Sequence, residues 1–416
     1  MQSENASKIE RYIRNEQLMT RKHFKLKNAR TRHKTQRKTV ISSQHFNLLK
    51  HYWKSICKNK MEQSVQETTE LTDSDFSTIR DNPMYQHIPK QIRHHFESTE
   101  THGILCKTNL KRGRNVNIYI AFTKTAKLHS KTPIYLNNII AWLNFISEFA
   151  SSHCSQKLNI FLLLNDAKKR IPEIDAEPID VINANTAFTT ACSAVNYIFV
   201  FRREEWFKVL MHETFHCFGL DFSSSFGDES NKHILSIFPA INPNTDVRLY
   251  ETYCEMWAEI FYFMFCQFTK STGECSRFSE SRFIRELRRE QLFSIFQSNK
   301  ILNRSRFKYS DMTHSVPSGI AQYREKTQAF SYYVLKSLML WNVDKFLEWC
   351  VKHNKKESPI QFDKSRIPEY CVFVEELVKT DRQYRIMTER TTFHKLLDTS
   401  NAKITMRMTA NDPDWT

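Results

Sequence analysis

Residues 195–219 read VNYIFVFRREEWFKVLMHETFHCFG, and this stretch decides the expected fold. Its first eight residues have the apolar and aromatic character of a buried strand, and they run directly into a helical pattern. Glu204 and Glu205 suit the first turn of that helix, because acidic groups there face the positive end of the helix dipole. Gly219 suits the end of the helix, where a left-handed backbone is common. We therefore predict a buried strand followed at once by a helix.

The predicted helix contains the pattern HExxH at residues 212–216. Residues four apart lie on the same helix face, so the rings of His212 and His216 can point at one ion. Neutral imidazole is a good Zn²⁺ ligand, and a catalytic zinc takes three protein ligands and one water. Glu213 would stand beside the metal as general base. The alternative reading is a pair of helix-face histidines bonded to core groups.

A third ligand is expected from residues 248–265, RLYETYCEMWAEIFYFMF. Glu251, Glu255 and Glu259 recur at every fourth position of an otherwise apolar helix pattern. Buried carboxylates on one face repel each other and are costly to desolvate unless a cation binds them. Asp221 is nearer to the histidines, but it lies one position early for the HExxHxxGxxH/D pattern. We expect Asp221 to brace the loop after the helix.

The segment Glu255-Met-Trp-Ala258-Glu259 resembles the ExxA(D/E) signature of the gluzincin metallopeptidases, the thermolysin-like zincins. The resemblance implies that Glu255 is the third zinc ligand and that Glu259 hydrogen-bonds a ligating histidine. Glu251-Thr-Tyr-Cys254-Glu255 is a second register, which leaves Glu251 open as the ligand. The resemblance covers roughly residues 195–270.

The segment FRREEWFKVLMHETFHCFGLDFS, residues 201–223, is also similar to uncharacterised HExxH proteins of large DNA viruses of protists. That similarity brings no known substrate with it.

The gluzincin resemblance also implies two further features of the site. The strand at 195–202 would lie near the active-site helix, in a sheet whose edge strand holds an extended peptide. A group that stabilises the oxyanion is needed, usually a His, Tyr or Arg from the C-terminal part. We predict His314 in that role. The alternatives are four tyrosines: Tyr250, Tyr253, Tyr309 and Tyr323.

The fold class expected from these patterns is α+β, with a mixed sheet packed on the HExxH helix and a helical C-terminal subdomain. Residues 103–122 read as a hairpin with Val116, Ile118, Ile120 and Phe122 on one face. We divide the chain into a basic, partly helical arm (1–60), an acidic polar linker (61–80), a zincin-like catalytic domain (81–270) and the helical subdomain (271–416).

Composition narrows the class of protein. The chain has 416 residues with 31 Phe, which supports a large core, and only six Gly, which disfavours Gly-rich phosphate loops. Its ten Cys form no CxxC pair, so zinc ribbons are excluded. The N-terminus has no apolar signal segment and no run is long enough to span a bilayer. We expect an intracellular protein, not secreted, with reduced thiols, of which Cys217 is a core residue.

Residues 21–39 hold nine Lys or Arg and no acid, out of a net charge of +16. Such an arm can bind nucleic acid or another polyanion, or direct a protein to the nucleus or a virion. The sequence thus supports two functions. The first is a zinc-dependent hydrolase that cleaves peptide or protein substrates. The second is a non-enzymatic structural or packaging protein whose arm binds nucleic acid and whose zinc only braces the fold. Neither the substrate nor the oligomeric state follows from the sequence.

Overall fold

The structure is a computed structural model of the chain. It describes residues 41–61, 67–99, 101–123, 131–174, 177–268, 277–317, 321–389 and 404–411. The predicted basic arm at 21–39 lies outside these ranges. Within them, no helix is both long and apolar enough to cross a membrane.

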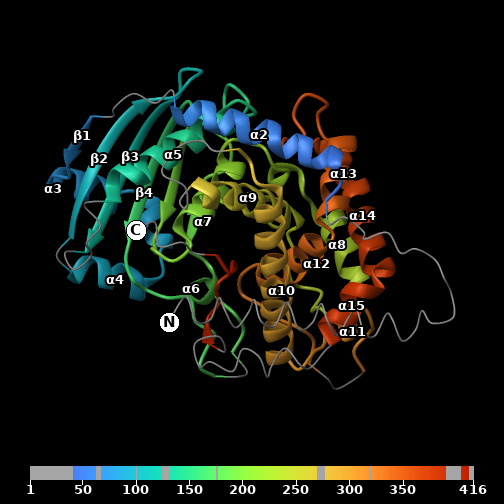
Figure 1. The fold of residues 1–416 in the computed structure, drawn as a ribbon. Helices are drawn as coiled ribbons and strands as arrows, with labels where there is room; N and C mark the ends of the chain where they lie inside the picture. The colour runs from blue at the N-terminus through green and yellow to red at the C-terminus, as the bar shows by residue number, and fades with distance from the viewer. Residues whose placement is uncertain are drawn as a thin grey trace.

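A six-stranded mixed sheet forms one side of the molecule (Figure 1). Its order is β1-β2-β3-β4-β6-β5, with β3, β4 and β6 parallel and the other neighbours antiparallel. The strands are β1 (Thr68–Glu70), β2 (Thr101–Asn109), β3 (Asn115–Thr123), β4 (Lys157–Leu164), β5 (Ala187–Thr189) and β6 (Val195–Val200). The predicted hairpin is confirmed as β2 and β3, and β5 is the edge strand on the side of the HExxH helix.

Both faces of the sheet are covered because side chains along each strand alternate between two cores. Val116, Ile118, Ile120 and Phe122 of β3 face the large core, as predicted. The opposite face, which includes Tyr119, packs on α3 (Asp73–Arg80), the 3₁₀ helix η2 (Pro83–His87) and α4 (Lys90–Ser98).

The large core holds the two helices that build the site. Helix α7 (Trp206–Cys217) follows β6 after a short turn, and α9 (Leu249–Phe268) packs against it. Helix α9 is apolar around most of its circumference and almost completely buried, as expected of a helix enclosed by other elements. Its glutamates are therefore held inside the protein.

The remaining helices lie around α7 and α9, and those that follow α9 in the chain lie mainly on the side away from the sheet (Figure 1). They are α2 (Ser43–Met61), α5 (Thr132–Ser147), α6 (Val181–Ala184), η4 (Ser223–Ser225), α8 (Asp228–Ile237), α10 (Glu280–Arg304), α11 (Tyr309–Met312), the π-helix η5 (Phe330–Leu335), α12 (Lys336–Trp341), α13 (Val343–His353), η6 (Lys364–Arg366), α14 (Ile367–Thr380) and α15 (Arg382–Glu389). The predicted α+β class, with a mixed sheet and a helical C-terminal region, is confirmed.

The structure corrects two local predictions. Residues 68–80 of the predicted linker form β1 and α3, because Phe76 and Ile79 are buried against the sheet. Glu204 and Glu205 lie before the first turn of α7 and not within it. Glu205 has a left-handed backbone, with φ 60°, and its side chain is buried. Gly219 does follow the helix end in the left-handed region, as predicted, with φ 65°.

Candidate active site

Helices α7 and α9 present complementary faces to each other. Lys208, His212 and His216 recur every fourth residue on α7, and Glu251, Glu255 and Glu259 do so on α9. Lys208 meets Glu255 at 2.5 Å, whereas His212 and His216 both meet Glu251. The contacts run in opposite directions along the two helices, so the helices are antiparallel at the site.

Three ligand atoms converge where the helices meet. Nε2 of His212 lies 3.1 Å from Nε2 of His216 and 3.0 Å from Oε2 of Glu251. The distance from His216 Nε2 to the same carboxylate oxygen is 3.4 Å. Two zinc bonds of about 2.1 Å at a tetrahedral angle hold their ligand atoms about 3.4 Å apart. The triangle therefore has the size of three corners of a zinc tetrahedron.

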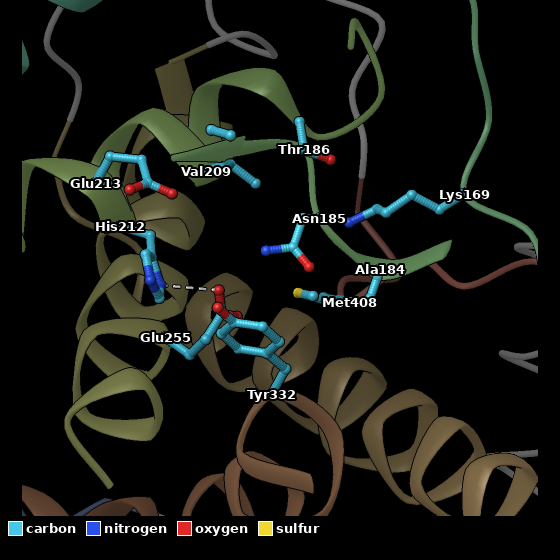
Figure 2. Close-up of a pocket in the computed structure, with 11 residues that line it drawn as sticks. Lys169, Ala184, Asn185, Thr186, Val209, His212, Glu213, Glu255, Tyr332 and Met408 are labelled. Carbon is cyan, nitrogen blue, oxygen red and sulfur yellow. Dashed lines mark ion pairs between the residues drawn. The ribbon is translucent and has the colours of Figure 1, made fainter. Parts of the chain in front are cut away.

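Carboxylates on the far side of each ring fix this orientation. Nδ1 of His216 makes a hydrogen bond of 2.7 Å with Oδ2 of Asp221. Nδ1 of His212 lies 3.0 Å from Oε1 of Glu255, an ion-pair distance without the angle of a hydrogen bond. Figure 2 shows the Glu255 carboxylate directed at the His212 ring. Carboxylate partners of this kind are typical of metal-ligating histidines, because they hold the hydrogen on one ring nitrogen and free the other for the metal.

This arrangement fits a bound cation. If both Nδ1 atoms carry hydrogens, two Nε2 lone pairs and a carboxylate oxygen face one another in a buried space. The surroundings also favour positive charge. Burial alone would lower the pKa of His212, but the carboxylates of Glu251 and Glu255 outweigh it and raise that pKa to about 9. A divalent metal would supply the charge and satisfy all three lone pairs at once.

The structure changes the roles expected of the three glutamates. Glu251, expected as a neighbour or alternative ligand, is the one beside both Nε2 atoms, whereas Glu255 lies behind His212. Glu259 contacts Lys336 at 3.0 Å, one turn farther along α9, and not a site histidine. Two of the three buried carboxylates are thus paired with lysines, Lys208 and Lys336, neither of which is predicted from the sequence. Asp221, expected to brace the loop, holds His216.

Glu213 lies next to the ligand cluster and lines a small pocket of about 20 Å³ (Figure 2). Burial is the largest cause that raises the pKa of Glu213, and the negative charges of Glu251 and Glu255 raise it further. His212 and His216 lower it, and the resulting pKa is about 7. A carboxyl group that titrates near neutral pH can both accept and return a proton.

Tyr332 replaces His314 as the candidate for oxyanion stabilisation. His314 is exposed after α11, and its ring contacts Ser310 and Thr313 of its own turn, so the prediction of His314 is corrected. Tyr332 lines the pocket, 6.0 Å from His212 between ring centroids. Burial and the carboxylates of Glu251 and Glu213 raise its pKa well above the ordinary value, so its phenol stays a donor.

The local backbone explains why the sequence did not reveal Tyr332. It belongs to the π-helix η5, and π-helical turns are frequent at functional sites. The four tyrosines that were predicted as alternatives to His314 lie elsewhere. The Tyr253 hydroxyl donates to the Ile360 carbonyl, and the Tyr323 hydroxyl donates to Glu325. The ring of Tyr309 packs on Tyr384. The ring of Tyr250 meets the His216 ring edge-on, outside the pocket.

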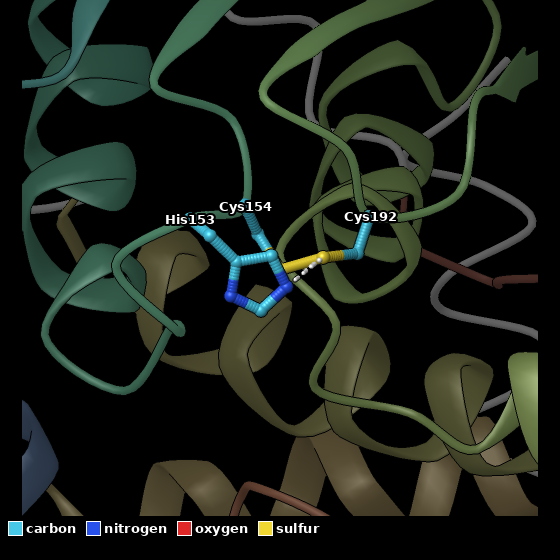
Figure 3. A group of neighbouring side chains, drawn as sticks. All are labelled: His153, Cys154 and Cys192. Atoms are coloured by element: carbon cyan, nitrogen blue, oxygen red, sulfur yellow. Dashed lines mark hydrogen bonds between the residues drawn. A yellow bond between two sulfur atoms is a disulfide. The ribbon is translucent and has the colours of Figure 1, made fainter.

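A second group of potential ligands stands apart from these residues. Cys154 and Cys192 form a disulfide, with Nε2 of His153 3.2 Å from the Cys192 sulfur (Figure 3). This corrects the expectation of reduced thiols for this pair. The two cysteines are 38 residues apart in sequence, and the fold brings the loop after α5 to the loop between β5 and β6. Cys217 is a buried free cysteine, as predicted.

No family model, curated protein or solved structure matches the chain.

Proposed function

We propose that the protein is a zinc-dependent peptidase in which His212, His216 and Glu251 hold the metal. The observation that carries the proposal is the ligand triangle, with a carboxylate behind each histidine and Glu213 beside it. A purely structural zinc site usually has four protein ligands and needs no adjacent free carboxylate. The register of the gluzincin signature that fits this geometry is Glu251-Thr-Tyr-Cys254-Glu255.

A zinc ion bound there would polarise the scissile carbonyl and acidify a bound water. Glu213 would accept a proton from a water held beside it and return that proton to the leaving amine. The Tyr332 phenol donates to the oxygen that gains negative charge. Residues 184–187, which lead into the edge strand β5, line the same pocket and would hold an extended peptide by its main chain.

The test compares wild type with Glu213→Gln for zinc content and for hydrolysis of a mixed peptide library. We expect about one zinc per chain in both proteins. Hydrolysis should fall by about 100-fold or more in the variant, because the base is lost while the ligands remain. His314→Ala is the matched control and should keep wild-type activity. A wild-type protein that binds zinc and cleaves no peptide would contradict the proposal.

Binding of nucleic acid through residues 21–39, and a location inside the cell, stay predictions from the sequence. The alternative function, a packaging protein, depends on nucleic-acid binding by the same residues 21–39. Deleting residues 21–39 should abolish salt-sensitive nucleic-acid binding if that arm is responsible.

A further inference from the structure

The pocket beside Glu213 has walls from six parts of the chain. Residues 184–187 form one wall, and Val209, His212 and Glu213 of α7 form another. Glu255 of α9 and Tyr332 close the third side. The remaining side is formed by Lys169 and by Met408, which comes from a segment far along the chain. Figure 2 shows the Met408 sulfur facing the space that these side chains surround.

Residues 404–411 are held mainly through their main chain. The Met406 amide donates to the Lys169 carbonyl, and the Ile171 amide donates to the Ile404 carbonyl. The Met408 and Thr409 amides both donate to Oε1 of Glu205, at 2.8 and 2.6 Å. Lys336 donates to the Met408 carbonyl at 2.8 Å.

The side chains that hydrogen-bond residues 404–411 are themselves buried and charged. Glu205 pairs with Lys169, and Lys336 pairs with Glu259 and Glu290, all of them at most 1% exposed. The left-handed backbone of Glu205 is a costly conformation for a non-glycine residue. Such a cost persists only where the surroundings require it. The segment is therefore a built part of the site.

The main chain supplies most of the anchoring of the segment, and the Met408 side chain adds one weak polar contact. Its sulfur accepts from Nζ of Lys208 at 4.0 Å, and the side chain is 5% exposed. Among the described residues, the backbone-to-backbone bonds of the segment go to Lys169 and Ile171 and not to β5. The segment therefore does not imitate a substrate on the edge strand; it closes the end of the pocket.

We propose that Met408 is a specificity-determining residue, which limits the pocket to small side chains of the substrate residue next to the scissile bond. The inference rests on the proposed peptidase function and adds the substrate class. The thioether fills the end of the pocket, so shortening it lengthens the space available to a substrate side chain. Hydrophobic pockets discriminate by about 10- to 200-fold per methylene-sized difference.

The experiment measures Kd for two zinc-chelating dipeptide hydroxamates, one with an alanine and one with a phenylalanine side chain beside the chelator. Wild type should favour the alanine probe. Met408→Ala should shift the ratio of the two Kd values by about tenfold toward the phenylalanine probe. The same shift is expected in the ratio of kcat/KM for matching peptides.

Met406→Ala is the matched control, since Met406 lies two residues away in the same segment, is fully buried and does not line the pocket. It should lower Tm and leave the ratio unchanged. An unchanged ratio in folded, zinc-loaded Met408→Ala overturns the inference, as does an equal shift in Met406→Ala. Zinc-loaded wild type that binds neither probe overturns the proposed function as well, which distinguishes the two failures.

Discussion

The two glutamates nearest to the histidines have different partners, and this difference can be measured. Glu251 lies beside both Nε2 atoms, whereas Glu255 lies behind His212 and against Lys208. We expect Glu251→Ala to lose almost all zinc, because a ligand is removed. Glu255→Ala should still bind zinc, with affinity reduced by about 10- to 100-fold, as for other groups that orient a ligand. Elemental analysis and competition with a chelator separate the two. The reverse pattern would restore Glu255 as the ligand.

The phenol of Tyr332 is expected to act on the transition state and not on the metal. Tyr332→Phe should keep zinc and lower kcat by about 100-fold, with little change in KM, because one donor to the oxyanion is lost. The neighbouring Tyr333→Phe is the control. Its hydroxyl donates to the Met406 carbonyl, so that variant should lose stability but keep kcat. Equal kcat values in Tyr332→Phe and wild type would remove Tyr332 from the mechanism.

At this scale the sequence predicted the residue types well and their contacts less well. The HExxH spacing alone placed His212, Glu213 and His216 together, because neighbours four apart on a helix must share a face. It could not choose between Glu251 and Glu255, which differ by one helical turn. That choice depends on how far α7 and α9 slide along each other, which the packing decides. Lys208, one turn before His212, carried a usable signal: a buried lysine on that face needs its own carboxylate.

Among the helices, the end of α7 depends on Gly219. Its φ is 65°, and a Cβ at that position would lie 3.1 Å from the Cys154 sulfur and 3.2 Å from the Cys192 Cβ. We expect Gly219→Ala to lower the free energy of unfolding by about 1–2 kcal/mol, because the left-handed backbone is unfavourable for alanine. Denaturant unfolding would measure the loss. Gly227→Ser is the control, since Gly227 is the N-cap of α8 with open space around it. A larger loss at Gly227 would contradict this account.

Strand alternation and helix periodicity predicted the hairpin, the β6–α7 unit and the helical C-terminal region because each depends on local patterning. The linker prediction failed for a different reason. Residues 68–80 are polar overall, yet Phe76 and Ile79 are enough to bury α3 against the sheet. The contribution of residues 404–411 to the site could not be predicted either, because it depends on contacts between segments more than 200 residues apart.

For the whole molecule, a half-buried carboxyl away from the site should give stability a dependence on pH. Burial raises the pKa of Glu325 from 4.5 to about 8, although Tyr323 and the Phe330 amide donate to it. The folded state thus binds this proton more tightly than the unfolded state. The contribution is fully present below pH 4.5 and is lost as the pH rises toward 8.

Glu325→Gln removes this titration. Its Tm should therefore fall less than that of wild type between pH 5 and 8, which thermal unfolding across that range would measure. Exposed Glu357→Gln serves as the control. Parallel curves for wild type and Glu325→Gln would show that this carboxyl is ionised in the folded protein.

The position of Met408 in the chain also has a consequence for biosynthesis. All the other residues that line the pocket precede residues 404–411 in the sequence, so residues 404–411 are synthesised last among them. The N-terminal part of a chain leaves the ribosome first, and the sheet, α7 and α9 are all synthesised earlier. A growing chain can therefore assemble the histidines and Glu251 while the end of the pocket is still open. Docking of residues 404–411 would then be the step that gives the newly made protein its final selectivity.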